Sequence, residues 1–107
     1  MNFTEEQLKE MLNNLSKHKN AYVRAQVAEQ GFALDKLIKD TDTRVRVGVV
    51  IGARKFNRKD LLNELIHDRE EKVRYALVMQ NYGLKRLSHD RNYWVKLAAS
   101  TKLNQTD

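Results

Sequence analysis

The chain has 107 residues, of which 41% are hydrophobic and 32% are charged, and this balance excludes a disordered chain and fits one small globular domain. It contains no cysteine, which excludes disulfide bonds and thiolate chemistry and is compatible with a reducing cytoplasm. Lysine and arginine number 20 against 14 acidic residues, so the net charge is +6 and an anionic partner has to be considered.

The first predicted helix begins at residue 4 or 5, where Thr4 and Gln7 have the spacing of a capping box. The apolar residues that follow recur at i, i+3, i+4 and i+7 and share one helix face: Leu8, Met11, Leu12 and Leu15. This acidic, amphipathic start is unlike a signal peptide, and no apolar run approaches the ~18 residues that a membrane span needs. We therefore expect a cytoplasmic protein that does not enter a membrane.

Helices are expected along the rest of the chain, because proline is absent and only four residues are glycine. A second helix should cover residues 23–30 and end at Gly31, and a short helix or 3₁₀ turn should follow at 34–39. Further helices are expected at 61–67, 73–80, 84–89 and 95–102.

One pattern occurs four times. Each copy contains a valine followed by a base, and the intervals between the valines are 22, 28 and 22 residues: Val23, Val45, Val73 and Val95. Five residues before the valine stands an acid in three copies and a histidine in the first: His18, Asp40, Asp68 and Asp90. With two leucines three residues apart in front, the unit reads L-x-x-L-x-x-(D/H)-x4-V-(R/K). Such repeats are typical of solenoids, whose stacked units share a core.

Residues 44–53 give conflicting signals. Alternating valines favour a strand, and Gly48 and Gly52 would each cost a helix about 1 kcal/mol relative to alanine. The repeat, however, aligns Gly48 with Ala76 and Ala98, a small-residue position at which two helices can approach closely. We therefore predict a helix here.

Aspartate followed at plus five and plus six by valine and arginine resembles the spacing of HEAT-like repeats, and the 22-residue period is similar to their short leucine-rich-repeat-variant branch. The resemblance covers nearly the whole chain. It implies an all-α fold, a right-handed α-α superhelix (solenoid) of about four short repeats, in a single domain over residues 1–107. The units would span approximately residues 4–30, 31–53, 57–80 and 81–104.

The resemblance also implies a ladder of ion pairs between neighbouring units, formed by Asp40, Asp68, Asp90, Arg24, Arg46 and Arg74. His18 replaces the first aspartate and Lys96 the last arginine, so the ladder should be incomplete at both ends. Some members of the variant group hold an iron–sulfur cluster through cysteines. Because this chain has none, we expect no cofactor.

The interval of 28 places six extra residues around 54–59, where four bases surround a phenylalanine. We expect a loop that projects from the stack, followed by a helix capped by Asn57. The candidate partner-binding surface comprises this cluster and three further bases: Arg54, Lys55, Phe56, Arg58, Lys59, Lys85, Arg86 and Arg91. An ordinary solvated loop is the alternative interpretation.

Other candidate sites are weaker. His67 and His89 share a repeat position, but a third ligand at suitable spacing is missing, so no metal site is expected. Tyr93 and Trp94 are expected to cover the last unit, with a partner anchor as the alternative. The chain has no glycine-rich phosphate loop, no H-E-x-x-H and no G-x-S-x-G, and we expect no catalytic residue and no enzyme.

These observations predict a small non-catalytic scaffold that binds another protein through the curved face of an α-solenoid. The alternative is nucleic-acid or polyanion binding through the basic surface around residues 54–59. Self-association through the exposed ends of the stack is a third hypothesis.

Overall fold

The computed structural model describes residues 2–105, and this part of the chain is all-α. It contains eight helices and no strand: α1 (Glu5–Leu15), α2 (Ala21–Glu29), α3 (Leu34–Leu37), α4 (Thr43–Lys55), α5 (Lys59–Leu65), α6 (Glu71–Met79), α7 (Leu84–Leu87) and α8 (Tyr93–Asn104). The all-α prediction is thus confirmed, and residues 44–53 lie within α4 and not in a strand.

Local capping sets most helix starts. The capping box of α1 is confirmed, because Thr4 Oγ1 accepts the Gln7 backbone N–H at 3.1 Å and Gln7 Oε1 accepts that of Thr4 at 2.9 Å. The residue three before each repeat valine is the N-cap of the helix that follows. Its side chain accepts a backbone N–H in three units, at Asn20, Asp42 and Asn92.

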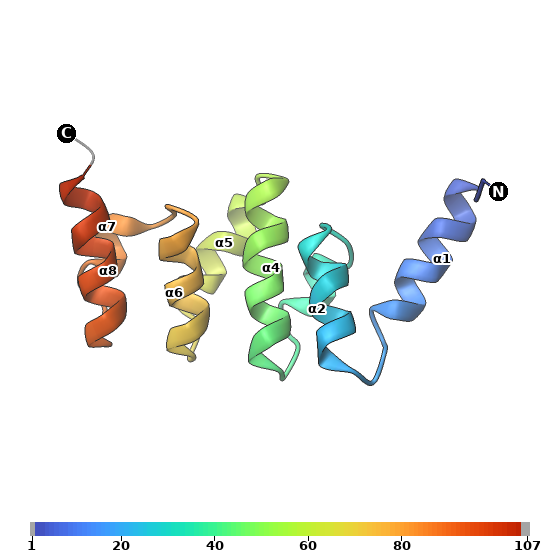
Figure 1. Ribbon diagram of the computed structural model, residues 1–107, viewed down its shortest axis with the longest axis horizontal. Coiled ribbons are helices and arrows are strands. Elements are labelled where there is room, and N and C mark those ends of the chain that lie inside the picture. The colour runs from blue at the N-terminus through green and yellow to red at the C-terminus, as the bar shows by residue number, and fades with distance from the viewer. Residues whose placement is uncertain (1, 106–107) are drawn as a thin grey trace.

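Figure 1 shows α2, α4, α6 and α8 side by side in chain order, all running in the same direction, with α5 and α7 behind them. The molecule measures 49 × 28 × 21 Å, and α1 and α8 lie at opposite ends of the longest axis. At the N-terminal end α1 leans away from α2 and contributes no fully buried residue.

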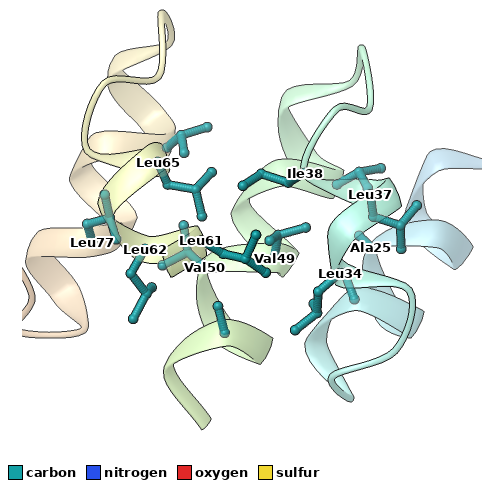
Figure 2. Packing of buried hydrophobic residues seen from close by; sticks show 14 of the residues in the cluster. Ala25, Leu34, Leu37, Ile38, Val49, Val50, Leu61, Leu62, Leu65 and Leu77 are labelled. Carbon is teal, nitrogen blue, oxygen red and sulfur yellow. The ribbon is translucent and has the colours of Figure 1, made fainter. Parts of the chain in front are cut away.

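One continuous core lies between the helices of the front row and the shorter helices behind them. The repeat leucines and valines fill it, and Figure 2 shows Leu34, Leu37 and Leu62 gathered around Val49 and Val50 of α4. The repeated pattern therefore identifies the buried positions of units two to four. In the first unit it does not, because Leu15 is 38% exposed.

The two glycines of α4 allow the close approach that the repeat predicted. A Cβ atom at Gly48 would lie 2.6 Å from the carbonyl oxygen of Ala25, and one at Gly52 would overlap the carbonyl oxygen of Ala28. The glycines that weaken α4 as an isolated helix are therefore needed for its contact with α2.

The six extra residues of the second unit do not form a projecting loop. They lengthen two helices, since α4 has 13 residues against 9 in α2 and α6, and α5 has 7 against 4 in α3 and α7. Gly31 and Asn81 follow the ends of α2 and α6 in the left-handed conformation. The same repeat position in the second unit holds Ala53, so α4 continues to Lys55, and Asn57 takes the left-handed conformation there at φ 55°. Asn57 thus ends α4, and the prediction that it caps α5 is wrong.

Candidate functional site

The recurring charged residues of the repeat lie between successive units. Each of the three arginines donates through Nε and Nη2 to both carboxylate oxygens of the aspartate in the next unit, at 2.8–2.9 Å and 3.2 Å: Arg24 with Asp40, Arg46 with Asp68, and Arg74 with Asp90. The remaining Nη1 donates to a backbone carbonyl six residues earlier in its own unit, at 2.6–2.7 Å. Each arginine therefore connects the turn of one unit to that of the next.

Each aspartate also holds its own turn. Its Oδ1 accepts the backbone N–H two residues further on, at 2.8–2.9 Å. Burial opposes ionisation of Asp90, but hydrogen bonds from Arg74 and from the backbone N–H of Asn92 outweigh it and lower the pKa of this carboxyl. The Arg74–Asp90 pair is almost completely buried, with side-chain exposures of 4% and 6%. These contacts are those of a structural network.

In the first unit, His18 takes the place of the aspartate and makes the same hydrogen bond within its own turn. His18 Nδ1 accepts the backbone N–H of Asn20 at 3.0 Å, the bond that the aspartates make elsewhere. At the other end Lys96 is exposed. The repeat motif therefore keeps its turn in the first unit without supplying a negative charge.

The basic cluster of residues 54–59 is largely engaged in contacts within the chain. Arg54 Nε donates to the Gln80 carbonyl at 3.1 Å, and Lys55 Nζ donates to the Glu29 carbonyl at 3.2 Å. These bonds tie the end of α4 to the ends of α6 and α2. Lys59, the first residue of α5, is exposed.

Arg58 is paired on both sides. Its Nη2 lies 2.8 Å from Asp35 Oδ1 and 2.9 Å from Asp60 Oδ2. The hydrogen bond with Asp60 and then that with Asp35 raise the pKa of Arg58. Phe56 is 58% exposed, and its ring lies so close to Gly31 that a Cβ there would overlap it. Arg58 and Phe56 thus already have intramolecular partners, as Arg54 and Lys55 do.

Lys85, Arg86 and Arg91 lie elsewhere. They line a hollow of about 780 Å³ together with His67 and His89. Arg91 precedes α8, whereas Arg54 and Lys55 are in the last turn of α4, and Figure 1 shows the start of α8 and the end of α4 at opposite edges of the row. The structure therefore does not bring the eight candidate residues together on one surface.

A second hollow lies between α6 and α8. It has a volume of about 620 Å³, and Tyr75, Met79, Trp94 and Leu97 line it with exposures of 41%, 43%, 66% and 44%. Tyr75, Met79 and Leu97 were not predicted as site residues from the sequence, although the repeat contains a pattern that could have indicated two of them. The positions two and six residues after the valine hold small or half-buried side chains in earlier units, and Tyr75 and Met79 depart from that trend.

Tyr93 and Trp94 do not cover the interior of the last unit. Both are exposed, at 64% and 66%, and their rings pack edge to face with centroids 5.1 Å apart. The side chain of Trp94 instead lines the hollow between α6 and α8. The expectation of a terminal cover is therefore wrong.

Within residues 2–105, no group of three or more histidine, cysteine or acidic side chains is arranged to hold a metal ion. Across the same residues, every helix is too short or too polar to cross a bilayer. Comparisons of the chain with protein-family models, with curated proteins and with solved structures found no match in any of the three.

Proposed function

We propose that this protein is a HEAT-like repeat protein of the short leucine-rich-repeat-variant type, and that its four units form a right-handed α-α superhelix. Two features support this proposal. The helices of successive units pack side by side in chain order (Figure 1), and an arginine of each of the first three units binds an aspartate of the next. In such a stack the second helices of the units form one continuous face.

We further propose that the protein is a non-catalytic scaffold that binds another protein through the hollow between α6 and α8. The observation that carries this proposal is the exposure of four large apolar side chains from two adjacent helices around one hollow. Contiguous apolar surface is characteristic of interaction sites, and tryptophan and tyrosine are enriched among the residues that dominate binding energy. The corresponding side chains of α4, Val47 and Ile51, are half-buried, so this exposure distinguishes α6 and α8 from α4.

The charges beside the hollow favour a partner segment that is apolar and acidic. Lys102 is the one charged side chain in the lining of the hollow among residues 2–105, and Lys72 lies one helical turn before Tyr75 on α6, beside the acidic Glu71. The charge in the hollow itself is therefore positive. An amphipathic segment could bury its apolar residues against Trp94 and Leu97 and place carboxylates near the two lysines.

The chain offers a matched pair of variants for the test. Trp94 and Tyr22 occupy the same repeat position, one residue before the valine, and are 66% and 63% exposed. A partner captured from the native host and then purified should bind Trp94→Ala at least about tenfold more weakly than the unmodified protein, and Tyr22→Ala should bind normally. Thermal unfolding should be similar for both variants. Equal affinity of the two variants for the captured protein would reject the hollow as its binding site.

Nucleic-acid or polyanion binding is the second candidate function. Three bases of the larger hollow favour it, because they make no ion pair within residues 2–105, while the pairing of Arg58 with two aspartates weakens the case for the cluster at residues 54–59. A duplex-DNA gel shift at several salt concentrations separates the candidates. If the protein binds nucleic acid, a plot of log affinity against log salt concentration should fall with a slope near −0.9 per phosphate contacted. If it binds only another protein, duplex DNA should show no gel shift. Light scattering over a range of concentrations tests self-association through the exposed apolar face of α1.

A further inference from the structure

The larger hollow lies where two units meet on the side of the ion pairs. Its walls come from the end of α5, from α7 and from the turn that leads into α8. Arg74 and Asp90, which neutralise each other, form part of the lining. Every other charged side chain in the lining is basic: Lys85, Arg86 and Arg91.

These three bases make no ion pair with any of residues 2–105. Their combined charge of +3 is half of the net charge of +6 that the whole chain carries. Arg86 Nη2 approaches His67 Nδ1 at 3.5 Å. The hollow therefore combines three positive charges with the His67 imidazole.

The repeat shows that the fold does not require Lys85 and Arg86. The preceding interface has a smaller hollow of about 290 Å³ in which Arg46 and Asp68 take the places of Arg74 and Asp90, while Lys39 and Arg69 take those of His67 and Arg91. At the positions of Lys85 and Arg86, the third unit has Asn63 and Glu64. The ion pair and the arginine after its aspartate are thus common to these two interfaces, and of the two only the last has Lys85 and Arg86 in addition.

We propose that this hollow binds an anion that contains a diphosphate group. The planar guanidinium of Arg86 can donate two parallel hydrogen bonds to phosphate oxygens, while Lys85 and Arg91 supply further charge at short range. Charge-assisted bonds of this kind are about twice as strong as neutral ones. The volume of about 780 Å³ exceeds that of the equivalent hollow and falls within the usual range of small-molecule sites. The proposal is independent of the partner-binding hollow between α6 and α8, with which it shares no lining residue.

The test is a calorimetric titration with inorganic pyrophosphate at low ionic strength. The decisive variant is Lys85→Asn with Arg86→Glu, because the third unit carries those two residues at the same positions. We expect it to fold normally and to bind pyrophosphate at least about tenfold more weakly. The control is Lys55→Asn with Arg54→Glu, which makes the same change of charge at the opposite edge and should leave the affinity within about twofold of normal.

Four results would overturn the proposal. They are the absence of pyrophosphate binding at millimolar concentration, an equal loss of affinity in both variants, sulfate binding as tight as that of pyrophosphate, and binding of a single-stranded oligonucleotide through these bases without binding of pyrophosphate. The last result would assign the surface to nucleic acid. If the double variant unfolds, Arg91→Gln replaces it. This variant should also bind pyrophosphate more weakly than the unmodified protein, and the control stays the same. A nucleoside diphosphate titrated in parallel distinguishes a free diphosphate ligand from a nucleotide that carries the group.

Discussion

Removal of Asp68 tests the view that the buried ion pairs connect neighbouring units. In Asp68→Ala the Arg46 guanidinium loses two hydrogen bonds, of 2.8 and 3.2 Å, and retains its bond to the Asp40 carbonyl. The backbone N–H of Glu70 also loses its acceptor. Because the side chains of Arg46 and Asp68 are only 6% and 9% exposed, water cannot readily replace these bonds.

We expect Asp68→Ala to lower the free energy of unfolding by about 3–5 kcal/mol, the usual cost of leaving one member of a buried pair without its partner. Urea unfolding at pH 7, followed by circular dichroism, measures it. Asp35→Ala provides the control, because Asp35 also binds an arginine but its side chain is 76% exposed, and the expected cost is below about 1 kcal/mol. Equal costs for the two variants would show that the buried pair does not stabilise the stack.

The same variant separates stability from binding. Asp68 lies outside the hollow between α6 and α8, so folded Asp68→Ala should bind a partner at that hollow with normal affinity. Loss of partner binding without a change in the melting temperature would contradict the structural role. Replacing both members, as Asp68→Leu with Arg46→Met, should recover most of the lost stability, because no buried charge then remains unpaired.

Two further predictions concern helix packing and pH. Gly52→Ala would stabilise an isolated helix by about 1 kcal/mol. In the protein it should instead lower the free energy of unfolding by about 1–3 kcal/mol, because the added Cβ overlaps the Ala28 carbonyl oxygen. Urea unfolding measures whether the free energy of unfolding falls or rises. Hydrogen bonds from the Arg44 side chain and N–H lower the pKa of Asp42 to about 2, so its contribution to stability is present above pH ~4 and is lost as the pH falls towards 2. Because Arg44 is 69% exposed, that contribution should stay below about 1 kcal/mol, and thermal unfolding of Asp42→Asn should depend less on pH in this range.

A stabilising effect of Gly52→Ala would show that α2 and α4 can separate at little cost. For Asp42→Asn, asparagine already caps two of the other helices at the same repeat position, so the cap itself should persist. An unchanged slope of stability with pH between 4 and 2 would then assign the pH dependence to other carboxylates.

The sequence predicted features that depend on neighbours within one helical turn or on a regular spacing. The start of α1 follows from Thr4 and Gln7, which bond each other directly. The helix at residues 44–53 required the repeat, because its own valines and glycines favour a strand. The end of α4 could not be predicted from the interval of 28 alone, since a longer helix and a projecting loop accommodate the same six residues.

The candidate site was less predictable, because the partners of its charges come from distant positions. Arg58 binds Asp35, 23 residues away, so a cluster that is basic in sequence is partly neutral in space. Lys85 and Arg91, in contrast, converge with His67 on one hollow. The repeat could have indicated this, because it places the turns of neighbouring units side by side.

By itself the amino-acid sequence determined where the helices begin to within two residues, which positions repeat and which of them are buried in the middle units. These properties follow from local hydrogen bonding and from periodic burial of apolar side chains. Only the tertiary structure decided which bases remain unpaired and which aromatic side chains remain exposed. The reason is that pairing and exposure depend on which residues of other units come within contact distance, and the packing of whole helices controls that.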